Sequence, residues 1–165
     1  MKNAIFDLDL TLVDTTVLET YRHMRDWQMA YANITKCRLY DGIQEVFDFI
    51  SANNVRTCIV STSPSPYVER LVRHFHMPID FIVGYHDAKP IKPSPAPMLK
   101  ALQLLESTPG NAVSFGDRGI DILSSKGAGI LSVACVWGTK EAELLRASRP
   151  DITIASPLDI IGLIR

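Results

Sequence analysis

Short apolar runs alternate with helix-like segments along the whole chain. In most of these runs the residues are apolar in succession and do not alternate with polar ones. This is typical of strands in a sheet that is covered on both faces. They cover residues 4–6, 57–60, 81–83, 112–115, 131–136 and 152–154. Apolar positions at helical spacing fill segments 43–50, 68–75, 98–105, 121–126, 140–147 and 158–163. This alternation predicts an α/β fold with a doubly wound, mostly parallel sheet.

One segment departs from this rhythm. Residues 15–40 lie between the first predicted strand and the helix that leads to the second strand. Apolar residues at helical spacing predict one or two helices there: Val17, Tyr21, Met24, Tyr31 and Ile34. Thr16 and Glu19 have the spacing of a capping box at a helix start. We therefore predict one domain over residues 1–165, with a small helical insertion at 15–40 above the end of the first strand.

Composition narrows the class of protein. The hydrophobic fraction is 47% and the formal net charge is −1, as in ordinary water-soluble domains. The chain has no strong excess of basic residues, so its charge does not indicate nucleic-acid binding. A phosphate-bearing polymer remains possible as a substrate. The three cysteines lie far apart, without the spacing of a metal site or a disulfide framework. The start lacks a signal-peptide pattern and no apolar run reaches membrane length, so we expect a cytoplasmic protein without membrane contact.

Polar side chains follow several predicted strands at the point where each strand ends. They are Asp7 and Asp9 after the first strand, Ser61 and Thr62 after the second, Lys92 after the third, Asp117 after the fourth, and Asp121 at the next helix start. Ligands of open parallel sheets bind beyond the carboxyl ends of the strands. We therefore expect these side chains to converge on one edge of the sheet.

The residue types at this edge indicate phosphoryl chemistry. Carboxylates, together with water and phosphate oxygens, form the usual shell of Mg²⁺. Two carboxylates placed as Asp7 and Asp9 can divide the work: one attacks phosphorus, and the other protonates the leaving oxygen and later activates water. Lys92 would neutralise negative charge, and Ser61 or Thr62 could donate a hydrogen bond to a phosphoryl oxygen.

Four segments resemble, in order, the motifs of the haloacid dehalogenase (HAD) superfamily. They read "FDLDLTLVD", "IVSTSP", "KPSPAPMLKAL" and "FGDRGIDILSSKGAG". The likeness covers nearly the whole chain and is greatest to the phosphoglycolate-phosphatase-like branch. It implies a Rossmann-like core and a Mg²⁺-dependent phosphatase that hydrolyses phosphomonoesters through an aspartyl-phosphate. The substrate would be a phosphorylated small molecule or a phosphorylated macromolecule.

The resemblance assigns the four acids. Asp7 takes the place of the nucleophile, which also binds the metal through a carboxylate oxygen. Asp9 takes the place of the general acid and base, with its main-chain carbonyl as a further metal ligand. Asp117 and Asp121 match the acids of the fourth motif, one binding the metal directly and the other directly or through water.

The resemblance also assigns the phosphate-binding residues. Ser61 stands where the second motif ends in Ser or Thr, and Thr62 stands where close relatives often have Asn. Lys92 matches the lysine of the third motif, and Lys89 is the competing match. Ser61, Thr62 and Lys92 would then contact the phosphate.

Two departures from the family pattern bear on the substrate. Leu10 stands where Gly is commonest and would narrow the space above the nucleophile. The insertion is much shorter than the helical cap of typical relatives, which would leave the site more open. An open site favours a bulkier substrate, closure by a partner subunit, or a promiscuous small-molecule phosphatase. The chain could therefore be a monomer or a homodimer.

The sequence leaves open the role of the charged and aromatic residues in the insertion and two alternative functions. The insertion carries more basic than acidic residues, and we favour a solvated helix face over a role in steering anions. Its aromatic residues Tyr21, Trp27 and Tyr31 are expected to pack onto the core. A catalytically idle HAD-fold binding protein and a phosphomutase are the alternative functions.

Overall fold

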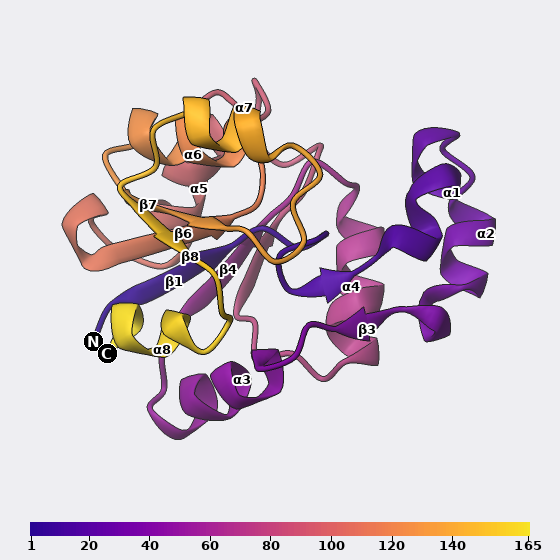
Figure 1. The fold of residues 1–165 in the computed structure, drawn as a ribbon, viewed down its shortest axis with the longest axis horizontal. Helices are drawn as coiled ribbons and strands as arrows, with labels where there is room; N and C mark the ends of the chain where they lie inside the picture. Colours follow the sequence, from indigo (N-terminus) through magenta and orange to yellow (C-terminus); the bar gives the residue numbers. More distant parts are fainter.

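Six parallel strands form the central sheet of the computed structural model, which describes all of residues 1–165 (Figure 1). The strands are β1 (Asn3–Phe6), β4 (Thr57–Val60), β5 (Phe81–Val83), β6 (Ala112–Gly116), β7 (Leu131–Cys135) and β8 (Ile152–Ile154). Their spatial order is β5-β4-β1-β6-β7-β8, so the chain winds from β1 first toward one edge and then toward the other. The apolar runs thus predicted all six strands, and the doubly wound α/β fold is confirmed.

Helices cover both faces of the sheet. They are α3 (Ile43–Ala52), α4 (Ser65–His74) and α8 (Asp159–Ile164) on one face, and α5 (Ala96–Leu104), α6 (Gly119–Gly127) and α7 (Ala142–Ala147) on the other. A short 3₁₀ turn, η3 (Pro109–Asn111), precedes β6. None of the helices combines the length and the apolar character that a membrane crossing requires.

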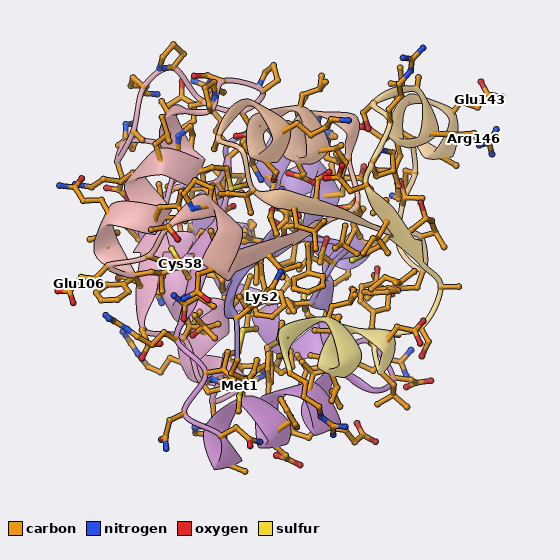
Figure 2. All side chains as sticks on the ribbon, turned by 90° about the vertical axis from the view of Figure 1, so that its left-hand side faces the viewer. Met1, Lys2, Cys58, Glu106, Glu143 and Arg146 are labelled. Atoms are coloured by element: carbon orange, nitrogen blue, oxygen red, sulfur yellow. The ribbon has the colours of Figure 1, made fainter.

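The alternation of side chains along each strand builds the two cores. Ala4 and Phe6 of β1 join the larger core with α3, α4 and α8, whereas Ile5 joins a second core with α5. The outer faces of the helices carry charged residues together with a few exposed leucines, among them Leu123 and Leu144. Figure 2 shows Glu143 and Arg146 of α7 extending away from the sheet. Each predicted helix is present, with boundaries within three residues of the apolar pattern.

The insertion lies beyond the carboxyl end of β1, beside α4 (Figure 1). It contains η1 (Thr16–Leu18), α1 (Glu19–His23), α2 (Trp27–Ala32) and η2 (Ile34–Lys36). Two short antiparallel strands, β2 (Val13–Asp14) and β3 (Arg38–Leu39), pair where the segment leaves and rejoins the core. The rings of Trp27 and Tyr67 lie 5.7 Å apart, and Tyr21 and Tyr31 also pack against the larger core. The expected packing of the three aromatic residues is confirmed.

The predicted capping box in the insertion is wrong. Thr16 begins a 3₁₀ turn, and α1 begins at Glu19 without a side-chain cap. The hydroxyl of Thr16 donates instead to Asp14 Oδ1 at 2.6 Å, because an acceptor two residues earlier competes for it. The next helix has the side-chain cap: Asp26 Oδ1 accepts a hydrogen bond from the Met29 amide at 3.1 Å.

The packing of Phe115 beneath the strand ends predicts that truncating this side chain lowers the free energy of unfolding strongly. Phe115 is fully buried and stacks on Phe6 with ring centroids 5.3 Å apart. Phe115→Ala should lower the free energy of unfolding by about 3–5 kcal/mol, because it removes apolar contacts and leaves a cavity. Urea denaturation followed by circular dichroism measures the change. The matched truncation Leu123→Ala, on a half-exposed side chain of α6, should cost about 0.5 kcal/mol or less; equal costs would contradict the assignment of the core.

Candidate active site

The strand order brings the acidic residues together. β1 and β6 are neighbours at the point where the direction of winding changes, and this point is the usual ligand crevice of a doubly wound sheet. Asp7 follows β1 and Asp117 follows β6. Together with Asp121, each offers a carboxylate oxygen within 4.8 Å of the oxygens of the other two, and all three residues are buried. The structure thus brings three of the four expected acids into one cluster.

Lys92 contacts two of the three acids of this cluster. Its ammonium group is buried and donates to Asp7 Oδ1 at 2.9 Å, to Asp121 Oδ1 at 2.5 Å, and to the Val60 carbonyl at 2.9 Å. Burial disfavours its charged form, but the charges of Asp121 and Asp7 outweigh that cost and raise the pKa of Lys92 above its usual range. Lys89, the competing match, lies instead with its Nζ 3.4 Å from the centre of the Tyr85 ring.

Negative charge exceeds positive charge in the cluster. Burial raises the pKa of Asp117 to about 9, and the charges of Asp7 and Asp121 add to this effect. Burial and Asp7 also raise the pKa of Asp121, although Lys92 opposes them. One ammonium group therefore faces three carboxylates. Buried carboxylate oxygens in surplus of their counter-charges fit a hard divalent cation such as Mg²⁺.

A glycine permits the close approach of Asp121. A Cβ atom added to Gly116 would lie 2.4 Å from the Cβ of Asp121, which no side chain can accommodate without backbone movement. Asp121 Oδ2 accepts a hydrogen bond from the Arg118 amide at 3.0 Å, at the start of α6. The hydroxyl of Thr11 orients the third acid by donating to Asp117 Oδ1 at 3.0 Å.

The carboxylate of Asp9 lies outside the cluster and has donors of its own. Oδ1 accepts hydrogen bonds from the Tyr67 hydroxyl at 2.6 Å and the Thr15 hydroxyl at 2.7 Å. Oδ2 pairs with Arg22 Nη2 at 3.1 Å. The sequence pattern did not single out Tyr67, because a buried tyrosine on an apolar helix face has the same pattern as any core residue. Asp9 thus sits beside the cluster with its orientation fixed by three donors.

Arg22 corrects one expectation about the insertion. Its side chain is only 20% exposed, so it does not belong to a solvated helix face, whereas Arg25, Lys36 and Arg38 are exposed as expected. Burial opposes its charge, but Asp9 outweighs this cost and the pKa of Arg22 is raised. Its Nε is buried without a hydrogen-bond partner. Arg22 therefore keeps unused donor capacity at the site.

A pocket of about 260 Å³ opens above these groups; we call it the Asp7 pocket. Its lining residues are Asp7, Asp9, Leu10, Glu19, Arg22, His23, Thr62, Asp117, Arg118, Lys140 and Glu141. Leu10 is the hydrophobic residue among them. It has a φ of +63°, in the left-handed region that favours glycine. This backbone conformation gives a physical reason for the glycine that is commonest at this position in the family.

Of the three residues expected to bind phosphate, Ser61 and Thr62 occupy different places. Thr62 lines the Asp7 pocket. Ser61 is buried, and its hydroxyl accepts a hydrogen bond from the Ser63 amide at 3.0 Å. Ser61 thus shapes the turn after β4, and it does not cap α4, which begins at Ser65.

Two ion pairs join the insertion to the core across the Asp7 pocket. Arg22 of α1 pairs with Asp9, and Glu19 at the start of the same helix pairs with Lys140 in the loop before α7. Ion pairs between residues that are not neighbours in the sequence cannot be recognised from the local sequence pattern. The insertion therefore supplies part of the pocket wall.

Comparisons with known proteins agree with this architecture. The family model described as haloacid dehalogenase-like hydrolase matches residues 18–135. A protein named "Putative pyrophosphatase PpaX" from Caldanaerobacter subterraneus is 33% identical over 152 residues, which cover 90% of this chain and 67% of the relative. Pyrophosphatase PpaX of Bacillus cereus is 28% identical, over 76% of this chain and 59% of the relative.

The solved structures show the same fold. A structure described as a predicted phosphoglycolate phosphatase from Haemophilus somnus superposes with a TM-score of 0.85 at 19% identity, covering 100% of this chain and 98% of that one. The chain spans only about three fifths to two thirds of the curated relatives' length, as the 59% and 67% coverages show. The family match and the 33% identity establish that this chain belongs to the haloacid dehalogenase-like hydrolase family.

Proposed function

We propose that the chain is a Mg²⁺-dependent phosphatase that hydrolyses phosphomonoesters through a phosphorylated Asp7. One observation carries the proposal: the carboxylates of Asp7, Asp117 and Asp121 lie close together, buried Lys92 binds Asp7 and Asp121, and Asp9 lies outside the cluster. The names of the relatives support it, since they include pyrophosphatases and a phosphoglycolate phosphatase.

Asp7 is the nucleophile in this proposal. Its Oδ1 is held by Lys92 at 2.9 Å, and the Thr11 hydroxyl lies 3.5 Å from Oδ2. Asp7, Asp117 and Asp121 would hold Mg²⁺, which lowers the repulsion between a carboxylate and an anionic phosphate. A carboxylate oxygen of Asp7 attacks phosphorus, and the bond from phosphorus to the leaving oxygen breaks. Lys92 and Thr62 bind phosphoryl oxygens and orient them for attack.

Asp9 moves the protons in this proposal. It protonates the leaving oxygen in the first step. In the second step it takes a proton from water, the water oxygen attacks the phosphorus of phosphorylated Asp7, and inorganic phosphate and free Asp7 result. Hydrogen bonds from Tyr67 and Thr15 hold Oδ1 of Asp9, and Arg22 pairs with Oδ2. These contacts hold the carboxylate of Asp9 in the lining of the pocket that Asp7 also lines.

Residues 15–40 act as a small cap in this proposal. Their first helix brings Glu19, Arg22 and His23 to the wall of the Asp7 pocket. Three cations of the same lining each pair with an acid of the lining: Arg22 with Asp9, Arg118 with Glu141, and Lys140 with Glu19. The cap thus contributes charge to the site as well as cover.

Asp7→Asn should abolish hydrolysis while the fold is kept. Loss of the nucleophile is expected to lower kcat/KM for p-nitrophenyl phosphate at least about 10³-fold. Phosphate release in Mg²⁺ buffer measures the change, and circular dichroism checks the fold. Asp159→Asn, an exposed acid at the start of α8, is the matched control and should retain activity. Full activity of Asp7→Asn would refute the nucleophile. A wild-type protein that binds Mg²⁺ and releases no phosphate would support the idle-protein alternative.

The charge surplus predicts how stability responds to pH and to Mg²⁺. The folded pKa of Asp117, about 9, exceeds its ordinary value of 3.8, so the folded chain binds the proton more tightly than the unfolded chain. In chelator, the free energy of unfolding should therefore fall as pH rises from about 4 to about 9, and Mg²⁺ should restore it. Thermal unfolding at several pH values measures this effect.

Asp117→Asn tests the same surplus by mutation. At pH 8 in chelator, the variant should be more stable than the wild type by about 1–3 kcal/mol, because Asn is neutral in both states, whereas folding of the wild type must take up a proton on Asp117 or bury its charge. The same variant should lose most of the stabilisation that Mg²⁺ gives the wild type. Asp159→Asn should leave both quantities unchanged. An Asp117→Asn protein stabilised by Mg²⁺ as strongly as the wild type would contradict the proposed ligand set.

A further inference from the structure

A second pocket adjoins the Asp7 pocket. It has a volume of about 350 Å³ and shares Arg22, His23 and Thr62 with the first, so the two pockets are neighbours with a common wall. We call it the Tyr85 pocket. Its remaining walls come from the insertion, from the start of α4, and from the loop after β5. Those residues are Arg25, Trp27, Ser63, Pro64, Tyr85 and His86.

The chemistry of the Tyr85 pocket differs from that of the Asp7 pocket. Its lining contains the rings of Trp27, Tyr85 and two histidines, together with two arginines, and it contains no carboxylate and no side-chain amide. Aromatic and guanidinium surfaces bind flat π-systems by stacking and cation–π contact. Recognition of a sugar by its hydroxyls would instead call for carboxylate or amide acceptors. The lining therefore fits an aromatic group attached to an anion.

Tyr85 is held in place before any ligand binds. The Tyr85 amide donates to the Ser63 carbonyl at 2.9 Å. Asp87 Oδ2 fixes the loop by accepting from the Gly84 amide at 2.7 Å and the Ser65 hydroxyl at 2.6 Å. Lys89 Nζ lies 3.4 Å from the centre of the Tyr85 ring. A ring on a tethered loop loses little conformational freedom on binding, which favours affinity.

Gly84 allows this loop to approach α4. A Cβ atom at Gly84 would lie 2.4 Å from Ser65 Oγ and 2.7 Å from the Ser65 amide nitrogen. The absence of a side chain at Gly84 therefore lets the loop that carries Tyr85 pack against the start of α4.

We propose that the Tyr85 pocket is the leaving-group subsite for the base of a nucleoside 5′-monophosphate, the phosphate of which enters the Asp7 pocket. The proposal rests on the proposed phosphatase function and names its substrate class. Arg22 lies at the junction of the two pockets, beside Asp9, where the ester oxygen of such a substrate would sit. Its unpartnered Nε adds donor capacity at this junction. The base then stacks on Tyr85, and Arg25 and His86 lie at its edge.

Turnover of two substrates that differ by the base tests the subsite. Phosphate release from adenosine 5′-monophosphate and from ribose 5-phosphate is measured in Mg²⁺ for the wild type, Tyr85→Phe and Tyr85→Leu. The ratio of the two kcat/KM values should be about 10 or more in the wild type, as one stacked base provides. Tyr85→Phe should retain the ratio because the ring is kept. Tyr85→Leu should lower it at least threefold. His74→Ala, an exposed histidine outside both pockets, should leave it unchanged.

The outcomes separate this inference from the function on which it rests. Equal turnover of the two substrates by the wild type, or a ratio that Tyr85→Leu leaves intact, would overturn the subsite while the phosphatase stands. Phosphate release from p-nitrophenyl phosphate but from neither of these two substrates would also overturn the subsite. Absence of phosphate release from all three compounds would overturn the phosphatase. In that event, calorimetric titration of the wild type in Mg²⁺ with the same two compounds decides the subsite. Tighter binding of adenosine 5′-monophosphate that Tyr85→Leu weakens supports the pocket, and equal binding refutes it.

Discussion

A single buried ammonium group holds the acidic end of the sheet together. Lys92 bridges Asp7 and Asp121 and donates its third hydrogen bond to the Val60 carbonyl. Removing one partner from a buried charge pair costs about 3–5 kcal/mol, because the remaining charge is left without compensation. Lys92 cannot balance Asp117 as well. In the proposed function a divalent cation would offset this surplus of buried carboxyl groups, so the stability of the cluster and its proposed chemistry depend on the same residues.

The sheet and the acidic cluster could be predicted from the sequence because both depend on simple patterns. Continuous apolar runs predicted the six strands, and parallel strands place their carboxyl ends at one edge. Asp7 and Asp117 directly follow two such runs, so their convergence followed from the same pattern. The resemblance already favoured Lys92 over Lys89, although both lysines precede proline in the same loop. In the structure, only Lys92 reaches Asp7.

The surroundings of Asp9 could not be predicted, because long-range contacts build them. Tyr67 reaches Asp9 across 58 positions in the sequence, and Arg22 reaches it from a helix that is too short to show a clear amphipathic period. The numbers of basic and acidic residues in the insertion do not show that Arg22 is largely buried and that Arg25 is exposed. The expected capping box failed for a similar reason, since Asp14 offered the hydroxyl of Thr16 a better acceptor. These contacts also shape the two pockets, so the proposed leaving-group chemistry became visible only in the folded chain.

The most direct test of the account is a crystal structure of the protein with Mg²⁺ and beryllium trifluoride, which mimics a phosphoryl group on a carboxylate. If Asp7 is the nucleophile, we expect the trifluoride on a carboxylate oxygen of Asp7 and a metal ion bound by Asp7, Asp117 and Asp121. Lys92 should contact the fluorines. Trifluoride on another residue, or a metal ion bound away from Asp117 and Asp121, would contradict it.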